Sequence, residues 1–192
     1  MKTKEIEYFK LFRNVCKTIN SSLNLKEVLD LITEKVVKVL QVKACTLFLL
    51  DREQRRLEVS ATCGLNETYL KKGPVYADQS IADSLGGETV LIYDATKDPK
   101  VQYPEEAKRE GIVSILSVPI PVKGEVIGVL RLYTSESRTF SDDDIEFVSG
   151  IAEMGGIAIV NAKLYEQMKE DSQCLMKDTW EWFETMLPKP SS

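Results

Sequence analysis

The chain has 192 residues, of which 43% are hydrophobic, so one domain of ordinary size with a full apolar core is expected. Its formal net charge of -5, with no long run of Lys and Arg, argues against nucleic acid or an anionic membrane as a direct partner. The histidine count is zero, which excludes Ser-His-Asp and Cys-His catalysis, a histidine-ligated haem and the usual imidazole-bound catalytic zinc.

The N-terminal residues MKTKEIEYFK contain no apolar stretch of the kind found in a signal peptide. No segment of the chain approaches the roughly 18 continuous apolar residues of a membrane span. We therefore expect a cytoplasmic protein with no membrane partner. In that compartment the cysteines, which form no CxxC pair, are expected to be reduced and unlinked: Cys16, Cys45, Cys63 and Cys174.

Two amphipathic helices are predicted at the start of the chain. The first covers Glu5 to Ile19, and its single apolar stripe consists of Ile6, Phe9, Phe12, Val15, Cys16 and Ile19. The second begins at Asn24, because Glu27 lies three residues on, as in a capping box, and Leu23 can pack against Val28. Its buried face is expected to consist of Val28, Leu29, Ile32, Val36, Val39 and Leu40.

Strands and short connecting elements follow. Residues 43–51 (KACTLFLLD) and 57–63 predict an antiparallel hairpin with a charged turn between its strands. The chain is then loop-like, with a short helix near 78–85 that ends at a glycine pair. A short strand at 89–93, an Asx-type turn at 94–99 and a short helix at 104–110 are predicted next.

Residues 111–134 (GIVSILSVPIPVKGEVIGVLRLYT) are predicted to form the central hairpin of the sheet. Two runs rich in Ile, Val and Leu flank Lys123-Gly124, where glycine permits a tight turn. Both strand faces are apolar apart from Arg131 and a few hydroxyls. We therefore expect other elements to cover both faces of the sheet.

The last predicted helix has the clearest start in the chain. Ser141 is the expected N-cap, three Asp residues follow at the positive end of the helix dipole, and Phe140 can pack against Ile145. The helical pattern continues away from the sheet with a period closer to 3.5 residues. Its apolar end predicts contact with a partner helix and contains Trp180, Trp182, Phe183 and Met186.

The order of these pieces resembles the GAF domain family. The strand LFLLD, the segment VLIYDATKDP, the hairpin around VPI, the helix start FSDDD and the apolar helix after it follow the family's order over roughly Leu23 to Glu166. The resemblance implies an α+β, profilin-like fold with an antiparallel sheet of about five or six strands. It places the terminal helices on one face, and loops with short helices over a ligand pocket on the other.

The resemblance also implies a function. GAF domains are mostly regulatory modules that bind small molecules between the sheet and the covering loops, and they commonly dimerise through their terminal helices. We therefore expect a non-enzymatic, homodimeric sensory domain whose ligand, possible cofactor and effector are not specified by the sequence. Residues 1–22 would form a dimerisation helix, 23–166 the GAF domain and 167–192 a helical extension.

Candidate ligand contacts follow from position in the family pattern. A cyclic phosphate, as in the cyclic-nucleotide-binding members, would bind amides near Gln79 and Ser80, although the NKFDE-type motif of those members is not visible here. Asp94, Asp98 or Ser114 would bind the base or ribose, unless the two Asp residues only stabilise their own turn. The expected contacts are Tyr76, Ser80, Ile81, Asp94, Asp98, Tyr103, Ser114, Leu116 and Arg131.

Arg131 is a lone charge in the middle of an apolar strand, and two placements are open for it. In one, the guanidinium points into the ligand cavity and pairs with a carboxylate or phosphate. In the other, the aliphatic stem packs and the head reaches solvent or a nearby Asp.

Other family chemistries leave different signatures. A bilin needs Cys beside His, and some haem-binding members need a His ligand, so the absence of histidine excludes both. The branch that reduces free methionine sulfoxide uses clustered cysteines, for which Cys45 and Cys63 are the candidates here. Cys45 lies in an apolar run and is expected to be a buried hydrophobe, whereas Cys63 is at a strand end. Such a redox enzyme, and a structural dimerisation module with a collapsed pocket, are the alternative functions.

Overall fold

The computed structural model describes residues 2–21, 24–77 and 82–186, except for the side chains of residues 2–3, 82, 174 and 177–186. Within these residues the core is a six-stranded antiparallel sheet of order β3-β2-β1-β6-β5-β4. The strands are β1 (Ala44–Asp51), β2 (Arg56–Cys63), β3 (Val75–Tyr76), β4 (Val90–Ile92), β5 (Ser114–Val122) and β6 (Glu125–Thr134). The helices are α1 (Lys2–Ser21), α2 (Leu25–Leu40), α3 (Glu67–Leu70), α5 (Ala82–Leu85), α6 (Pro104–Glu110) and α7 (Asp142–Met186).

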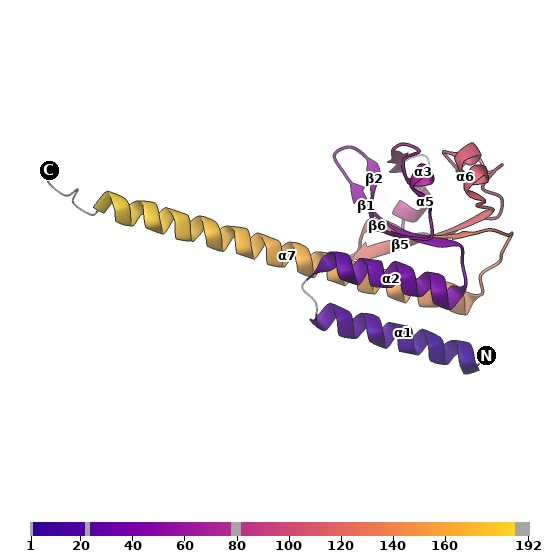
Figure 1. Ribbon diagram of the computed structural model, residues 1–192, viewed down its shortest axis with the longest axis horizontal. Helices are drawn as coiled ribbons and strands as arrows, with labels where there is room; N and C mark the ends of the chain where they lie inside the picture. The colour runs from indigo at the N-terminus through magenta and orange to yellow at the C-terminus, as the bar shows by residue number, and fades with distance from the viewer. Residues whose placement is uncertain (1, 22–23, 78–81, 187–192) are drawn as a thin grey trace.

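These elements are stacked in layers on the two faces of the sheet (Figure 1). Helices α3, α5 and α6, with the described parts of the loops that join them, lie on one face and are called the roof below. Helices α2 and α7 pack on the other face, and α1 lies outside them, against both. The sheet is therefore covered on both sides, as its apolar strands require.

The predicted central hairpin is confirmed. Val122 pairs with Glu125 across the turn, and Lys123 and Gly124 have φ values of 52° and 84°, the left-handed pair that a two-residue hairpin turn needs. The pairing of β6 with β1 explains a second glycine. A Cβ on Gly128 would lie 2.1 Å from the Phe48 carbonyl oxygen, so only glycine allows the two backbones to approach this closely.

Helix α2 also begins as predicted, and its predicted buried face is confirmed except at Val39, which is only half-buried. The Asn24 side chain accepts hydrogen bonds from the Lys26 and Glu27 amides, which satisfies two free donors at the helix start. The predicted contact between Leu23 and Val28 cannot be described, since Leu23 lies outside the described residues. The buried residues of α2 are Val28, Leu29, Ile32, Thr33, Val36 and Leu40.

The predicted apolar stripe of α1 is wrong at its N-terminal half. Ile6, Phe9 and Phe12 are 53%, 66% and 40% exposed, whereas the residues buried against α2 and α7 are Tyr8, Leu11 and Val15. The helix has apolar side chains on two sides, and residue spacing alone does not say which side meets the domain. The exposed side is therefore an apolar surface without a partner among the described residues.

The short elements of the roof were predicted in part. Helix α6 has the predicted bounds 104–110, and β4 lies within the predicted strand 89–93. Helix α5 forms the end of the predicted helix near 78–85, whose residues 78–81 lie outside the described residues. The four-residue helix α3 and the two-residue strand β3 were not predicted, because such short segments show no periodicity.

Helix α7 runs without a break across the expected boundary at residue 167 (Figure 1). Contrary to the expectation from sequence, its segment Asp142–Gln173 is long and apolar enough to cross a membrane by length and composition alone. In the domain body, however, this helix buries Val148, Ile151 and Ile159 completely in the core, as a core helix of a globular protein does. The side chains of Trp180, Trp182, Phe183 and Met186 lie outside the described residues.

The start of α7 is tied to α1 by one buried carboxylate. Ser141 and Asp144 form a reciprocal capping box, in which each backbone amide donates to the other side chain at 3.2 Å. Asp144 also accepts hydrogen bonds from the Tyr8 hydroxyl and, at 2.6 Å, from Lys4 Nζ. The Tyr8 ring stacks on Phe147 with 3.9 Å between ring centroids. These contacts hold α1 in place.

Replacement of Asp144 by Asn tests this connection. Burial alone would raise the pKa of Asp144, but hydrogen bonds from Lys4, Tyr8 and the Ser141 amide outweigh burial and lower the pKa from 3.8 to about 2. The carboxylate therefore stabilises the fold above about pH 4, and this contribution is lost as the pH falls through about 2. We expect Asp144→Asn to lower the free energy of unfolding by about 2 kcal/mol at neutral pH. Hydrogen exchange should show faster exchange of the α1 amides.

Asp143→Asn is the matched control, because Asp143 is exposed in the same helical turn. It should lose only a helix-dipole contribution of about 0.3–1 kcal/mol. Equal destabilisation by the two substitutions, or unchanged α1 exchange in Asp144→Asn, would contradict the proposed connection.

Candidate ligand site beneath the roof

A small space remains between the roof and the sheet. Its volume is about 10 Å³, room for about one water molecule. Among the described residues, the roof therefore leaves little room above the sheet at this point. The residues that line the space are Tyr69, Lys72, Val75, Ile92, Val101, Gln102, Tyr103, Ile115 and Arg131.

Strand alternation directs Arg131 into this space. Its neighbours Leu130 and Leu132 belong to the core beneath α2 and α7, so the side chain between them points to the roof. The register of β5 and β6 places Ser117 opposite Arg131, whose Nε donates a hydrogen bond to Ser117 Oγ at 3.1 Å. The Phe48 ring centroid lies 5.9 Å from the guanidinium carbon. Of the two placements open from sequence, the cavity-facing one is observed, and Arg131 is only 5% exposed.

The end of α3 brings a second cation to the same space. Asn66 caps α3 by accepting a hydrogen bond from the Tyr69 amide at 2.7 Å, and Lys72 follows one turn later. Lys72 Nζ lies 3.9 Å from the centroid of the Tyr69 ring and 5.8 Å from that of Tyr103. It also donates a hydrogen bond to the Tyr69 carbonyl oxygen at 3.3 Å. Aromatic faces thus surround the ammonium group.

Burial and a like charge both act on Lys72. Burial, and then the charge of Arg131, lower the pKa of Lys72 from 10.5 to about 8, although the charge of Glu106 acts in the opposite direction. Lys72 is therefore less readily protonated than an ordinary lysine.

Hydrogen bonds close one wall of the space. The Tyr103 hydroxyl and the Gln102 side-chain amide donate to the Pro74 carbonyl oxygen at 2.8 and 3.2 Å. Gln102 in turn accepts a hydrogen bond from the Tyr76 amide at 3.0 Å. These bonds fasten the loop before α6 to β3 and cover the space from outside.

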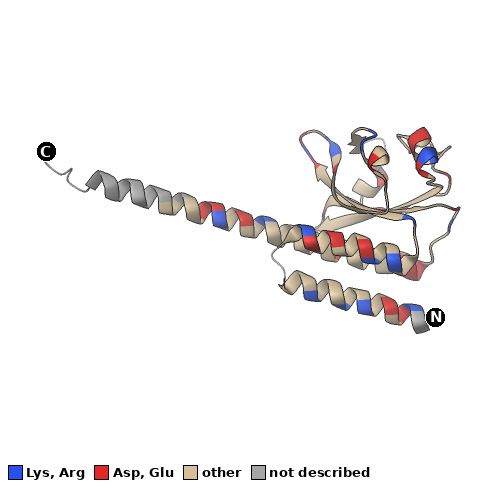
Figure 2. Cartoon of the chain, in the orientation of Figure 1, with Lys and Arg blue, Asp and Glu red and all other residues tan. Residues whose placement is uncertain are grey.

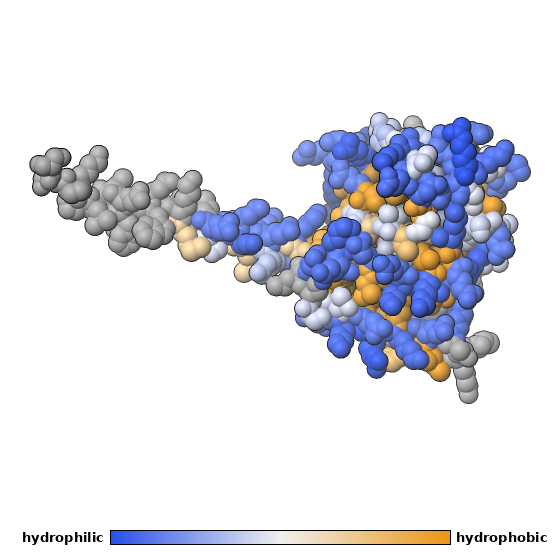
Figure 3. Space-filling model, in the orientation of Figure 1, coloured by the Kyte–Doolittle hydropathy of each residue, from blue (hydrophilic) through white to orange (hydrophobic). Residues whose placement is uncertain are grey.

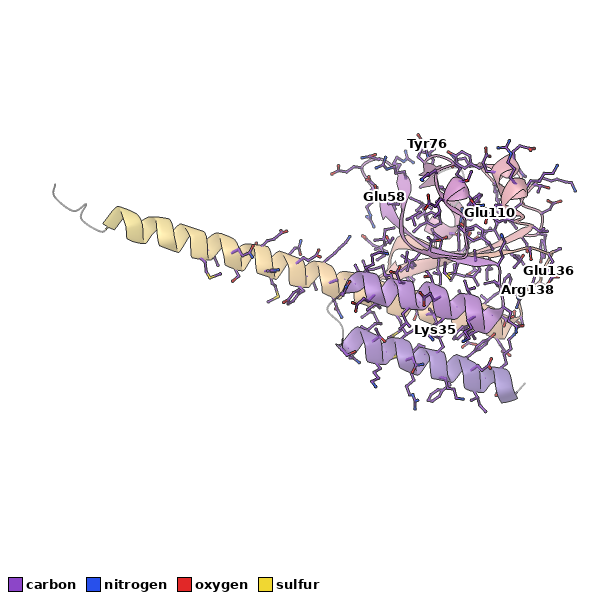
Figure 4. All side chains as sticks on the ribbon, in the orientation of Figure 1. Lys35, Glu58, Tyr76, Glu110, Glu136 and Arg138 are labelled. Carbon is purple, nitrogen blue, oxygen red and sulfur yellow. The ribbon has the colours of Figure 1, made fainter. Side chains whose placement is uncertain are left out.

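The structure brings few of the predicted ligand contacts together. Among the described residues, Tyr103 and Arg131 are the predicted contacts that line the space. Tyr76 is 44% exposed and lies at the outer edge of the roof, far from the helical layers (Figure 4). Leu116 is buried in the core beneath α2 and α7, and Ser114 shares a hydrogen bond with the Thr134 hydroxyl at the strand end. The remaining two, Ser80 and Ile81, lie outside the described residues.

Asp94 and Asp98 stabilise their own turn. Asp94 Oδ1 accepts hydrogen bonds from the hydroxyl and the amide of Thr96 at 2.6 and 3.0 Å, and Lys97 Nζ lies 2.9 Å from Oδ2. Hydrogen bonds from Thr96 and then Lys97 lower the pKa of Asp94 to about 2. Asp98 accepts a hydrogen bond from the Lys100 amide at 2.9 Å. The alternative in which the two Asp residues stabilise their own turn is therefore observed.

No sequence pattern pointed to Tyr69, Lys72 or Ser117. Ser117 could not be placed from the turn at Lys123-Gly124 alone, because a register shift between Ile120 and Pro121 moves its partner by one residue, from Leu130 to Arg131. Lys72 and Tyr69 gave no usable signal, since they belong to a short helical turn in a segment that looks like a loop.

The cysteines do not form a reactive cluster. Cys45 and Cys63 are directly opposite each other on β1 and β2. Burial raises the pKa of Cys45, and burial followed by the charge of Glu34 raises the pKa of Cys63, which disfavours the thiolate in both cases. Within the described part of the chain, no group of three or more Asp, Glu, Cys or His residues is placed to hold a metal ion.

Comparison with known proteins identifies the family. The GAF domain profile matches residues 22–160, and the chain belongs to the GAF domain family. It is 32% identical over 175 residues to the methyl sulfide methyltransferase-associated sensor of Methanosarcina acetivorans, covering 87% of this chain and 18% of that protein. It is 25% identical over 142 residues to a phosphoenolpyruvate-dependent phosphotransferase system protein of Escherichia coli, covering 73% of this chain and 19% of that protein. The chain thus spans less than a fifth of these relatives.

Solved structures confirm the predicted fold. The GAF domain of a Coxiella burnetii phosphoenolpyruvate-protein phosphotransferase superimposes with a TM-score of 0.74 at 24% identity, covering 84% of this chain and 98% of that one. Free methionine-R-sulfoxide reductase from Neisseria meningitidis has a TM-score of 0.70 at 14% identity, covering 82% of this chain and 91% of that one. At these identities the likeness shows the fold alone. GAF domains are generally regulatory rather than catalytic, and the Methanosarcina relative is a sensor.

Substitution of Lys72 tests the electrostatics of the site. Because the folded pKa of about 8 lies below the ordinary value of 10.5, charged Lys72 opposes folding at neutral pH, and this penalty is relieved as the pH rises above about 8. We expect Lys72→Gln to stabilise the ligand-free domain at pH 7. Relative to that variant, the wild type should gain on the order of 1 kcal/mol between about pH 8 and 10.

Urea unfolding over this pH range measures the effect, and Lys71→Gln is the control because Lys71 is exposed and paired with Glu67. The control curve should run parallel to the wild type. A gap between wild type and Lys72→Gln that does not change with pH would contradict the assignment.

Proposed function

We propose that this chain is a regulatory GAF domain that binds a small molecule between the sheet and the roof and signals through its terminal helices. One observation carries the proposal: strands β5 and β6 belong to both the candidate site and the helical core. Arg131 and Ser117 face the roof, while Leu130 and Leu132, next to Arg131 in β6, pack in the core beneath α2 and α7. A shift of these strands on binding would therefore change how α7 packs.

Such a signal requires two states of the domain. The ligand shifts their equilibrium only by the difference between its affinities for them, so tight binding alone would not produce a signal. Helix α7 is suited to carry the change, since it starts on the sheet and continues well beyond the domain body (Figure 1). The receiving effector is a second protein or a further domain, and the sensor among the curated relatives supports this role.

The proposed domain is cytoplasmic and non-catalytic, and it binds neither nucleic acid nor a membrane. The raised pKa values of Cys45 and Cys63 support a non-catalytic role, because thiol chemistry needs the thiolate. The charged residues support the remaining points. Acidic and basic residues are mixed along α2, and α1 has Glu5 and Glu7 before Lys10, Arg13 and Lys17, so neither helix carries charge of one sign only (Figure 2).

A homodimer through α1 and α7 is part of the proposal. Tyr8, Phe9, Phe12 and Phe147 line an open apolar groove of about 370 Å³ between these helices. Beyond the part of α7 that packs on the sheet, this helix exposes Leu164, Met168 and Leu175. Successive residues of this set are four and seven positions apart, as in a coiled-coil seam. Apolar side chains reach the surface between charged ones over the helical layers (Figure 3). A second copy of the chain can cover both surfaces.

Native mass spectrometry of freshly purified protein tests ligand binding directly. We expect a retained small molecule, and a thermal-shift screen of cyclic nucleotides, amino acids and 2-oxo acids should identify a stabilising class. A ligand at 100 times its Kd adds about 2.7 kcal/mol to the free energy of unfolding. Absence of any bound or stabilising compound would contradict a sensory role.

Sedimentation velocity tests the dimer. Phe9→Asp combined with Phe12→Asp should give a monomer, because the new carboxylates would lie in an apolar interface beside Glu5, Asp143 and Glu146. Lys17→Asp, an exposed charge change on the same helix, should remain dimeric. A wild-type chain that is monomeric at every concentration, or a dimer that survives deletion of α1 and of α7 beyond residue 166, would contradict this interface.

Two alternatives remain to be tested. The near-closed space of about 10 Å³ favours a purely structural dimerisation module, which would bind no compound in the screen. The other alternative is a thiol enzyme, since the fold is shared with a methionine sulfoxide reductase. In that case the protein should drive NADPH consumption with thioredoxin and free methionine sulfoxide, and Cys63→Ser should abolish it.

A further inference from the structure

The chemistry of the site beneath the roof is set by two cations that line one small space. Arg131 enters from the sheet and Lys72 from the end of α3. Phe48, Tyr69 and Tyr103 contribute rings around the two cations, Ser117 contributes a hydroxyl, and the charge of Glu106 acts on Lys72. Two positive charges thus line the same space, with Arg131 buried and Lys72 half-buried.

Like charges in such a place repel each other more strongly than they would in water. A guanidinium does not give up its proton in a protein, so Arg131 keeps its charge. The repulsion instead favours the neutral form of Lys72. The lowered pKa of Lys72 has this repulsion as its second cause, after burial. Aromatic faces and a serine hydroxyl lessen the cost of burying the two charges.

We propose that the space beneath the roof binds a small anion, a carboxylate or a phosphate, held between the ammonium group of Lys72 and the guanidinium of Arg131. The inference rests on the proposed sensory function and names the ligand class for it. Anion oxygens accept hydrogen bonds from both cations, and the guanidinium offers paired donors that match a carboxylate or phosphate. The Gln102 amide and the Tyr103 hydroxyl line the same space as further polar groups, and the Ser117 hydroxyl holds the Arg131 guanidinium beside it.

The walls limit what else the ligand carries. Val75, Ile92, Val101 and Ile115 line the rest of the space and offer contact only to a short apolar group. With about 10 Å³ in this structure, binding must widen the space. The wall that closes it is the one fastened by Tyr103 and Gln102 to the Pro74 carbonyl oxygen. An anion that competes for those two donors loosens this fastening as it binds.

Anion titrations test the proposal. Pyruvate and inorganic phosphate are added to the full chain at constant ionic strength, balanced with chloride, and the melting temperature and calorimetric Kd are measured. Pyruvamide is the uncharged counterpart of pyruvate. We expect at least one of the two anions to stabilise the wild type and pyruvamide to have no effect.

Variants locate the binding. Lys72→Gln and Arg131→Gln should each weaken the affinity for that anion at least about tenfold, the effect of losing one charge-assisted hydrogen bond. Lys71→Gln, the exposed neighbour, should bind as the wild type does. Arg131→Gln removes a buried group, and this variant can fail to fold. In that case the result for Lys72→Gln, which is expected to be the more stable protein, decides the test.

Affinity should also depend on pH. Lys72 is faced by Tyr69 from α3, Arg131 from β6 and Glu106 from α6, with Tyr103 beside it. Since the anion binds protonated Lys72, its affinity should fall as the pH rises above about 8, and it should lose this dependence in Lys72→Gln.

Failure of this inference can be told apart from failure of the sensory function. If both anions leave the wild type unchanged, or Lys72→Gln binds as tightly as wild type, the anion assignment is wrong. If native mass spectrometry then recovers an uncharged or cationic compound, the sensory function stands without it. If no compound of any charge binds, both proposals are wrong.

Discussion

The structure depends on the strict alternation of side chains along β6. Leu130 and Leu132 are completely buried in the core beneath α2 and α7, and Arg131 between them is turned to the roof. A slip of one residue would bury the guanidinium among leucines and isoleucines, at a cost of several kcal/mol for an unpaired charge. The charge therefore fixes the register of the central strand. The same register aligns Ser117 with Arg131.

From this constraint the two faces of the sheet acquire different properties. The helical face is apolar and closely packed, with Gly155 admitting Ile32 and Leu47 to within 3.6 Å of where its Cβ would be. The roof face is assembled from short elements held by individual hydrogen bonds, such as those to the Pro74 carbonyl oxygen. Short elements with few buried contacts open at lower free energy than core strands and helices. Rearrangement on ligand binding is therefore expected on the roof face.

The sequence predicted those parts of the fold that have a local chemical cause. The turn at Lys123-Gly124, the cap at Asn24 and the capping box at Ser141 each follow from a few neighbouring residues, and all are observed. The stripe of α1 was misplaced because its burial depends on α2 and α7, which residue spacing does not include. Of the candidate site, Arg131 was predicted and Lys72 was not. Their proximity joins β6 to the end of α3, 59 positions earlier in the chain, and no local pattern encodes such a contact.

Crystals of the wild-type chain can show whether the roof face of the GAF sheet receives an anion between Lys72 and Arg131. One structure would be solved from crystals grown with pyruvate or phosphate, and a second from crystals grown without either. We expect an anion whose oxygens lie about 3 Å from Lys72 Nζ and from the Arg131 guanidinium, with the Tyr103 wall displaced. An unchanged, closed roof with no anion between the two cations, at concentrations that saturate binding in solution, would contradict this expectation.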